Sequence, residues 1–467
     1  MHVIMTTDTT ITPDACRGFF CTFQKADLFR RCLVLVFAAV FMAFGLAACK
    51  NDKQKTRDTI RFAVVADPHL YDTALGASGP DFESYVQDQV KMTAQSEAVF
   101  IEAARMIMEM EPKPAFLLIP GDLTKDGEEE SHRLMADHLH RIKDSGIAVF
   151  VVPGNHDIDN PEAAAYGGFG SVPVYSPKAG EFADIYAPFG YDQAIYRDRH
   201  SLSYIAEPAA GLWLFAIDAC RYEENTDLHV IGGLLKAETL EWLLIHLEEA
   251  REKGKTVIAM MHHGLVEHLI GHGAFIPEAL IEDWDAIGRK LASAGMNVIF
   301  TGHYHTQNIT RRRWDPETFI VEIQTGSLVN YPVPLRVVDF DMGKAEMDVQ
   351  SLFVKDIPRE QYPDEFCCFA AFAKDFSYTH KRDFAVTQLT DRYDLTPAEI
   401  EWFATMLTDA TMAHFAGDEA MPIEVLLEIF DHYNSGNPDV AEIAQILISL
   451  YSDLPPQDND AVIRLKP

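Results

Sequence analysis

The stretch "NVIFTGHYHTQN", residues 297–308, places two histidines directly behind a short apolar run. The run at 297–301 is nearly continuous in Val, Ile and Phe, which is typical of a strand that is covered on both faces of a sheet. Gly302 interrupts the run, and His303 and His305 follow one residue apart. A lone histidine behind a strand is usually only a packed side chain, so the meaning of this pair depends on the residues behind the other strands.

Five more apolar runs have the same character, and helical patterns separate several of them. The runs are residues 60–66, 115–120, 148–153, 211–218 and 256–261. Helical patterns precede the second, third and fifth of these runs, at residues 95–110, 128–146 and 236–254. This alternation predicts a layered α/β fold. Further strands that would complete a sheet are expected at residues 318–328 and 334–343.

Residue types that bind metals come directly after nearly every one of these runs. The segments are "ADPHL" (66–70), "PGDLT" (120–124), "PGNHD" (153–157), "MMHHG" (260–264) and "TGHYH" (301–305). In layered α/β sheets, ligands bind in the crevice beyond the carboxyl ends of the strands. We therefore expect these five segments to converge on one site. The side chains they bring are Asp67, His69, Asp122, Asn155, His156, Asp157, His262, His263, His303 and His305.

The composition of this set predicts which metals it binds. Oxygen and nitrogen donors without a thiolate suit Mn, Fe or Zn. The number of donors exceeds the need of one ion, and a central carboxylate suits two ions about 3.5–4 Å apart. The sequence thus predicts two divalent transition metal ions, which turn bound water into a hydroxide nucleophile and clamp the oxygens of an in-line phosphoryl displacement. Gly121, Gly154 and Gly302 precede ligands at sharp turns, where close backbone approach matters.

Taken together, the motifs resemble those of the calcineurin-like metallophosphoesterases over roughly residues 60 to 340. The family pattern D-x-H, G-D, G-N-H-[D/E], H and G-H-x-H is complete in this chain. The resemblance implies an α/β fold, a layered β-sandwich flanked by helices. It also implies that His156 faces the substrate with Asp157 nearby, and that His262, with His263 as the alternative, is a ligand. The implied first-metal ligands are Asp67, His69 and His305, the second-metal ligands are Asn155, His262 and His303, and the bridging ligand is Asp122.

A finer resemblance concerns the branch of the family. "GDLTKDG" (121–127) and "GHYHTQN" (302–308), followed by helical patterns, are similar to bacterial lipoproteins of the cyclic-nucleotide phosphodiesterase branch. This implies a phosphodiesterase that acts on cyclic nucleotides or similar small phosphodiesters. The alternatives are a phosphomonoesterase or pyrophosphatase of the same fold, or a surface-binding lipoprotein without catalysis. The intact His156 argues against the last, because a mere binder needs no group aimed at a leaving oxygen.

The N-terminal region predicts export and a lipid anchor. Lys25, Arg30 and Arg31 precede the apolar residues 33–48, and "LAAC" ending at Cys49 resembles a bacterial lipoprotein signal. Sixteen apolar residues suit a signal-peptide core better than a membrane span, although an anchor helix is the alternative. We expect the protein to lie outside the cytoplasm, at the bacterial cell envelope, held by a lipid on Cys49. The expected parts are a signal peptide (1–48), a tether (49–59), a catalytic domain (60–354) and a helical C-terminal domain (355–467).

Composition limits the partners of the protein. With 39 basic and 71 acidic residues, the chain has a formal net charge of −32. Such a charge excludes polymeric nucleic acid, whose phosphates require a basic surface. A small phosphoester, with nucleotides among the candidates, remains compatible because metal ions reverse the charge locally. In the C-terminal part, Thr396 and Pro397 are expected to begin a helix as its N-cap and first residue.

Overall fold

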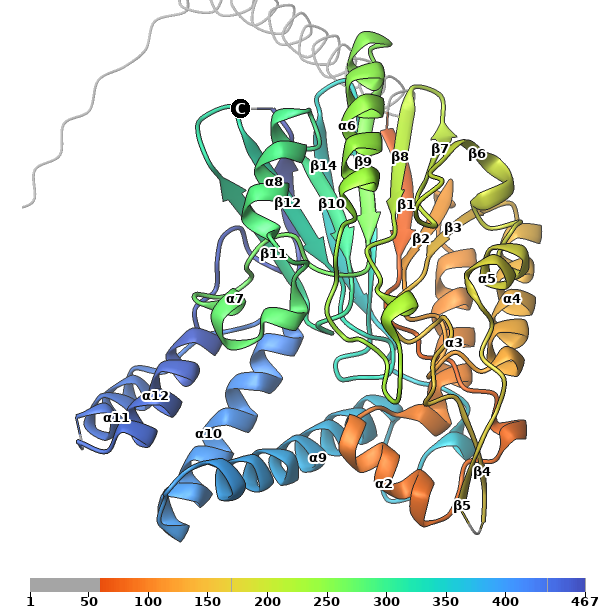
Figure 1. Ribbon diagram of the computed structural model, residues 1–467. Helices are drawn as coiled ribbons and strands as arrows, with labels where there is room; N and C mark the ends of the chain where they lie inside the picture. The colour runs from red at the N-terminus through yellow and green to blue at the C-terminus, as the bar shows by residue number, and fades with distance from the viewer. Residues whose placement is uncertain (1–58, 169, 435, 467) are drawn as a thin grey trace, which may run out of the picture. The chain divides into compact units, whose positions relative to one another are not determined.

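A computed structural model describes residues 59–168, 170–434 and 436–466. The expected signal peptide, the lipidated Cys49 and nearly all of the tether lie outside the described residues. The described residues from Ile60 onward form one compact unit. Two large β-sheets, their covering helices and a group of C-terminal helices make up this unit (Figure 1).

The first sheet has six strands, and three of the metal-ligand segments come after its parallel strands. In order across the sheet the strands are β15 (Ala461–Arg464), β14 (Glu346–Phe353), β13 (Pro334–Asp341), β1 (Thr59–Val64), β2 (Phe116–Pro120) and β3 (Ala148–Val152). Strands β1, β2 and β3 are parallel, with Phe62 opposite Phe116 and Phe116 opposite Ala148. Strands β13, β14 and β15 pair antiparallel with one another. The carboxyl ends of β1, β2 and β3 therefore meet at one edge of the sheet.

The second sheet has seven strands and again a parallel centre. Across the sheet the strands are β11 (Asn308–Arg313), β12 (Phe319–Gln324), β10 (Val298–Thr301), β9 (Thr256–Met261), β8 (Leu212–Ile217), β7 (Tyr204–Ala209) and β6 (Ala194–Arg197). Strands β8, β9, β10 and β12 are parallel, and the other three are antiparallel to their neighbours. A small separate hairpin consists of β4 (Ala164–Gly167) and β5 (Gly170–Pro173).

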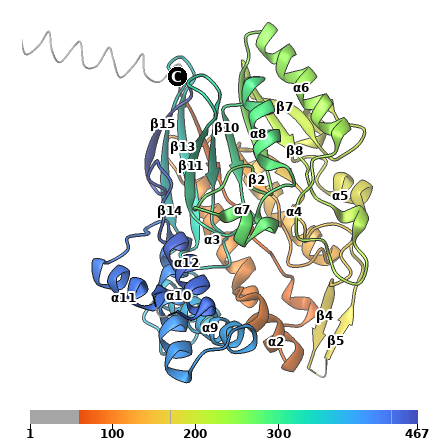
Figure 2. The same ribbon diagram turned by 60° about the vertical axis from the view of Figure 1, so that its left-hand side comes forward.

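The two sheets pack face to face around a shared apolar core. Phe62 stacks on Phe116 at 4.7 Å between ring centroids and meets Phe300 of the other sheet edge-on at 5.4 Å. Helices cover the outer faces (Figures 1 and 2). The first sheet carries α3 (Ser96–Met108) and α4 (Glu129–Asp144), and the second carries α6 (Ala237–Glu252) and α8 (Trp284–Ser293). The predicted layered β-sandwich flanked by helices is confirmed.

The C-terminal region is helical, in agreement with the prediction from the sequence. Its helices are α9 (Phe369–Arg392), α10 (Pro397–Ala416), α11 (Ile423–Tyr433) and α12 (Pro438–Leu450). Helix α10 begins as expected: the Thr396 hydroxyl accepts from the Glu399 N–H, and the Glu399 carboxylate accepts from the Thr396 N–H. Buried side chains such as Leu389, Phe403 and Ile443 form a core of its own. None of the helices that the structure describes is long and apolar enough to cross a bilayer.

Strand β15 lies near the end of the predicted helical C-terminal domain (355–467), and the sequence did not predict it. The chain leaves α12, returns to the first sheet and pairs β15 with β14, with Ile463 opposite Met347. The run "AVIR" has only four residues, which is too short for a clear sequence signal. Its partner β14, more than 100 residues earlier, supplies the hydrogen bonds that make it a strand.

Three further α-helices within the described residues are short. They are α2 (Pro80–Gln89), α5 (Ala179–Ile185) and α7 (His272–Phe275). Both views place α2 and α9 near one another at the same end of the sheets, and the β4–β5 hairpin hangs beside α2 (Figures 1 and 2). A cavity at this end is bordered by residues of α2 and of the C-terminal helices α9, α10 and α12.

Candidate metal centre

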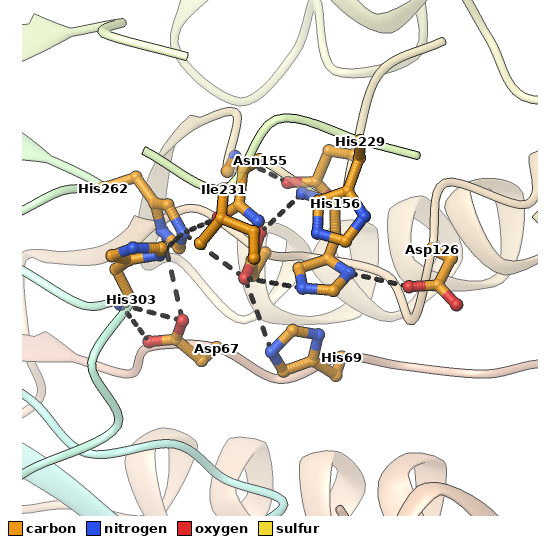
Figure 3. Close-up of polar contacts among 12 residues, drawn as sticks. Asp67, His69, Asp126, Asn155, His156, His229, Ile231, His262 and His303 are labelled. Carbon is orange, nitrogen blue, oxygen red and sulfur yellow. Dashed lines mark hydrogen bonds and ion pairs between the residues drawn. The ribbon is translucent and has the colours of Figure 1, made fainter. Parts of the chain in front are cut away.

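The five predicted segments converge at the carboxyl ends of the central strands. They come after β1, β2, β3, β9 and β10, which end at Val64, Pro120, Val152, Met261 and Thr301. Their side chains are buried or nearly so. Figure 3 shows Asp67, His69, His262 and His303 pointing toward one another from different loops.

Asp122 lies at the middle of the converging side chains. Its Oδ2 is 3.4 Å from the His69 Nε2 on one side and 3.3 Å from the His262 Nε2 on the other. Two groups of donor atoms share this carboxylate, and within each group all atoms lie within 4.8 Å of one another. The first group is Asp67, His69, Asp122 and His305, and the second is Asp122, His262 and His303.

Asn155 completes the second group. Its Oδ1 is 3.0 Å from the His262 Nε2. The seven residues thus fall into the two sets that the resemblance implied, with Asp122 common to both.

The hydrogen bonds of the histidines fit a cation within the second group. The Nδ1–H of His262 donates to the Pro120 carbonyl at 2.8 Å, and the Nε2–H of His303 donates to the Glu278 carbonyl at 3.0 Å. If both imidazoles are neutral, the other ring nitrogens, the His262 Nε2 and the His303 Nδ1, carry lone pairs and can only accept. These two atoms nevertheless face each other at 3.2 Å. Acceptors that face each other in this way, beside an amide oxygen and a carboxylate, fit a metal ion. The hydrogen bonds to the Pro120 and Glu278 carbonyls fix the ring orientations of His262 and His303, so that the other nitrogen of each ring can bind the metal ion.

The charges at the centre also favour a cation. Burial lowers the pKa of His262, but Asp122 and Asp67 outweigh it and raise the pKa to about 9. Burial raises the pKa of Asp122, but His262, His156 and His69 outweigh it, so this carboxyl is held well below its usual pKa. The centre is thus an ionised carboxylate that attracts positive charge, which a metal ion supplies in place of a proton.

The backbone of the ligand loops is held in unusual conformations. Five of the seven expected ligands have a positive φ, between 39° and 70°: Asp67, His69, Asp122, His303 and His305. Non-glycine residues rarely adopt this region, and such strain is concentrated at functional sites. The ligand positions are therefore maintained at a conformational cost.

Two glycines allow the loops to approach the ligands. A Cβ on Gly154 would lie 2.0 Å from the Asp122 Oδ1, and one on Gly302 would lie 2.3 Å from the Asp67 Oδ2. Neither distance is sterically acceptable, so any side chain here would displace a ligand carboxylate. The predicted role of these glycines, close backbone approach, matches their positions.

His156 borders the centre but lies outside both ligand groups. Its backbone N–H donates to the Asp122 Oδ1 at 3.0 Å, and its Nε2 is 4.0 Å from the Asp122 Oδ2. The Nδ1–H donates to the Asp126 Oδ1 at 2.6 Å. Burial, followed by the charge of Lys91, lowers the pKa of His156 to about 4. The Nε2 therefore faces the metal centre, where a substrate oxygen would lie.

Three residues around His156 were missed by the sequence reasoning. They are Asp126, Lys91, whose Nζ is 3.4 Å from the His156 Nε2, and His229, whose ring centroid lies 4.4 Å from that of His156. Asp126 lies in the quoted motif "GDLTKDG" and could have been singled out there. Lys91 and His229 follow no strand and belong to no motif, so only the tertiary structure finds them.

Asp126 is itself held by a buried lysine. The Lys125 ammonium pairs with both Asp126 and Glu128, at 3.1 Å for Glu128, and lies 4.1 Å from the centroid of the Tyr85 ring. Burial lowers the pKa of Lys125, but Asp126 and its other neighbours outweigh this and raise it well above the usual value. A permanent cation thus keeps Asp126 ionised and in place beneath His156.

Asp157 has its carboxylate among the backbone N–H groups of two ligand loops. Its carboxylate accepts from the backbone N–H groups of Gly154, Leu123 and Thr124, at 2.8, 3.1 and 3.0 Å. It therefore ties the loop after β3 to the loop after β2 rather than facing a substrate. The structure gives it a positioning role.

The two adjacent histidines after β9 have different surroundings. His262 reaches Asp122, whereas the Nε2–H of His263 donates to the Ile231 carbonyl at 2.9 Å. His263 packs against His303 with 4.4 Å between ring centroids and belongs to neither donor group. The geometry thus agrees with the preference for His262.

The chain is similar to two solved phosphatase structures. No curated protein matches the sequence. A dimetal phosphatase from Danio rerio is 15% identical, with a TM-score of 0.43 over 62% of this chain and 95% of its own. A purple acid phosphatase from yellow lupin (Lupinus luteus) is 10% identical, with a TM-score of 0.40 over 63% of this chain and 51% of its own.

The family assignment rests on a stronger match. The family model of the calcineurin-like phosphoesterases matches residues 60–307, which is more than half of the chain and contains all seven expected metal ligands together with His156. The chain therefore belongs to the calcineurin-like phosphoesterase family.

Proposed function

We propose that this protein is a metal-dependent phosphodiesterase that hydrolyses small phosphodiesters, with cyclic nucleotides among the candidate substrates. The observation that carries the proposal is the position of Asp122 between two groups of donors, with His156 directly beside it. Membership of a phosphoesterase family supports hydrolysis of a phosphoric ester. Family membership alone does not distinguish a diester substrate from a monoester substrate, so the preference for a diester is part of the proposal.

The seven expected ligands would hold the two metal ions in two sets. Asp67, His69 and His305 would hold one divalent ion, Asn155, His262 and His303 the other, and Asp122 would contact both. When bound, two divalent ions lower the pKa of water and stabilise the attacking and leaving oxygens of an in-line displacement.

The side chains around His156 serve the leaving oxygen and the phosphoryl group. His156 presents its Nε2 toward the centre, and its Nδ1–H is fixed by Asp126. Because the lowered pKa leaves the ring neutral near pH 7, the ring must first take up a proton at the Nε2, from where it can protonate a leaving oxygen. The Lys91 ammonium, 3.4 Å from the His156 Nε2, adds a positive charge where phosphoryl oxygens would gather.

The space around the centre supports a diester. Two cavities border it on different sides: His305 lines one, and His156 and Asp126 line the other. A phosphodiester carries two organic substituents, and each cavity can receive one of them. The segments "GDLTKDG" and "GHYHTQN", similar to those of the phosphodiesterase branch, support the same preference.

The test compares a diester with a monoester. Protein loaded with Mn²⁺ is expected to hydrolyse bis(p-nitrophenyl) phosphate with a higher kcat/KM than p-nitrophenyl phosphate. His156→Ala should lower the kcat for the diester by about 10²–10⁴-fold, whereas the exposed His200→Ala should not change it. A higher kcat/KM for the monoester contradicts the diester preference, and no hydrolysis of either compound contradicts the proposal.

We also propose that a lipid on Cys49 anchors the protein at the outer side of a bacterial membrane. The support is the apolar stretch 33–48 that ends in "LAAC" and the polar segment behind it. Metabolic labelling with an alkyne fatty acid should tag the full chain and fail to tag Cys49→Ala. Equal labelling of both chains would contradict the anchor.

A further inference from the structure

A large cavity separates the metal centre from the C-terminal helices. Its volume is about 650 Å³, within the range of small-molecule sites. Helices α9, α10 and α12 form most of its wall, and the metal ligand His305 forms part of the rest. We call it the apolar chamber because its wall is mainly hydrophobic and aromatic, with Val90, Tyr304, Phe384, Leu389, Phe415 and Ile446.

Basic side chains line the apolar chamber on the side of α9. The Lys381 ammonium lies 3.4 Å from the centroid of the Phe415 ring, and within the described residues it has no hydrogen bond or ion pair. Desolvation lowers the pKa of Lys381 to about 7. Arg392 also lines the chamber. An anionic phosphoester with an apolar substituent therefore finds no electrostatic barrier on this side.

The second cavity at the centre has the opposite character. We call it the acidic chamber: its volume is about 440 Å³, and Asp81, Asp88, Asp126 and Glu162 line it together with His156. Within the described part of the chain no lysine or arginine lines it. Asp88 and Gln89, at the end of α2, border both chambers. Asp126 is paired with Lys125, and Glu162 with His229. Asp81 and Asp88 have no ion pair within the described residues, so they would lose solvation against an apolar substituent and repel an anionic one.

The position of His156 assigns a role to each chamber. A leaving oxygen that takes a proton from His156 must lie on the side of the acidic chamber, which His156 lines. The substituent that stays on the phosphorus then extends toward His305 and the apolar chamber. The contrast between the two chambers thus orients an asymmetric substrate.

We propose that the substrates are phosphodiesters with one apolar substituent, which binds in the apolar chamber, and one hydroxylated or cationic alcohol, which leaves through the acidic chamber. This inference rests on the proposed phosphodiesterase function. In the reaction, the oxygen of water bonds to phosphorus and the bond between phosphorus and the polar alcohol breaks. The alcohol oxygen takes a proton from the protonated His156 ring, and the attacking water releases a proton that replaces it. The products are the free alcohol and a phosphomonoester that retains the apolar group.

A series of phosphodiesters of glycerol with n-alkyl alcohols tests the inference. With glycerol as the constant leaving group, kcat/KM for glycerol release should rise about threefold to fourfold for each methylene added from methyl to hexyl. Hydrolysis of all members at the same kcat/KM would overturn the apolar chamber as a binding site and leave the phosphodiesterase function intact. Absence of hydrolysis for every member would contradict the proposed function itself.

Substitutions in the apolar chamber test whether the dependence of kcat/KM on alkyl length arises there. Ala385 and Leu407 line the apolar chamber. Ala385→Trp fills it and Leu407→Glu places a charge in it, so each should lower the hexyl-to-methyl ratio of kcat/KM by about tenfold or more. The matched control is Thr387→Trp, an exposed position of the same helix outside the chamber, which should keep the ratio. Unchanged ratios in both chamber variants would refute the assignment.

The binding of two phosphonates tests the apolar chamber without any hydrolysis. Hexylphosphonate and methylphosphonate cannot be hydrolysed, and calorimetry gives their Kd values for the metal-loaded protein. Hexylphosphonate should bind at least tenfold more tightly, and Ala385→Trp should remove that difference while Thr387→Trp keeps it. Equal affinity of the two phosphonates for the unsubstituted protein would overturn the inference even if every ester in the series were inert.

Discussion

The His156 Nδ1–H donates to the Asp126 Oδ1 at 2.6 Å, and the other oxygen of Asp126 pairs with the buried Lys125 ammonium. This chain of three side chains fixes which nitrogen of His156 faces the metal centre. A carboxylate that orients an imidazole also stabilises the ring when it is protonated. The orientation of the proposed general acid is thus built into the loop after β2.

Removing the charge of Asp126 should impair turnover more than stability. Asp126→Asn no longer stabilises the protonated ring, so kcat for bis(p-nitrophenyl) phosphate should fall by about 10–100-fold, and the acidic limb of the pH–rate profile should shift. Glu128→Gln is the matched control, because Glu128 also pairs with Lys125 but does not contact His156. Similar kcat losses in both variants would show that the effect is structural.

Lys91 should contribute to transition-state stabilisation. Its ammonium is buried, and burial lowers its pKa although Asp122 and Asp126 oppose this. Lys91→Met keeps most of the side-chain volume and removes the charge, so kcat/KM should fall by about 10²–10³-fold. The metal content should be unchanged by plasma mass spectrometry. A normal kcat/KM in Lys91→Met would contradict a role of Lys91 in transition-state stabilisation. The control is Lys113→Met, at an exposed position.

The close approach of Gly302 to Asp67 predicts a metal-binding defect. A Cβ at this position would lie 2.3 Å from the Asp67 Oδ2. Gly302→Ala should therefore displace that carboxylate and lower the bound metal to one ion per chain or less. Gly180→Ala, where a Cβ meets nothing within 4 Å, should keep both ions and full activity. Full metal loading of Gly302→Ala would contradict the assigned role of Asp67.

A buried pair of carboxyl groups predicts how stability changes with pH. Burial raises the pKa of Glu419 to about 8, and burial and Glu419 raise that of Asp458 to about 8. Glu419 pairs with His414 at the end of α10, and Asp458 accepts from the Ile309 N–H of β11. They therefore lie where the helical region meets the second sheet.

The direction of the pH dependence is set by the raised pKa values. Both groups bind protons more tightly in the folded than in the unfolded chain, so their stabilising contribution is complete below about pH 4 and is lost as the pH rises through 8. Scanning calorimetry should show the Tm falling by about 3–6 °C between pH 5 and 9. Glu419→Gln should reduce this dependence. A Tm that rises over the same interval in the unsubstituted protein, or an equal slope in the variant, would contradict the assignment.

The sequence was informative where its signals are local. Each expected ligand lies within a few residues of an apolar strand, and parallel strands bring such ends together, so the convergence of Asp67, Asp122 and His303 could be predicted. The start of α10 could also be predicted from the sequence, because the capping residues Thr396, Pro397 and Glu399 lie within one helical turn.

Tertiary contacts account for the features that the sequence did not reveal. Lys91 follows α2 rather than a strand, and it reaches His156 because the neighbouring Met92 N–H is bound by the Val329 carbonyl. The contact between Asp126 and His156 joins two different loops. The apolar chamber combines α9, α10 and α12 with loop residues of the catalytic region, and no local pattern encodes such a combination.

The central claim is that two metal ions lie on either side of the Asp122 carboxylate. Anomalous diffraction from crystals of Mn²⁺-loaded protein tests it most directly. The account predicts two anomalous peaks about 3.5–4 Å apart, one beside His69 and His305 and the other beside His262 and His303, with Asp122 bound to both. A single peak, or two peaks that do not share Asp122, would contradict it.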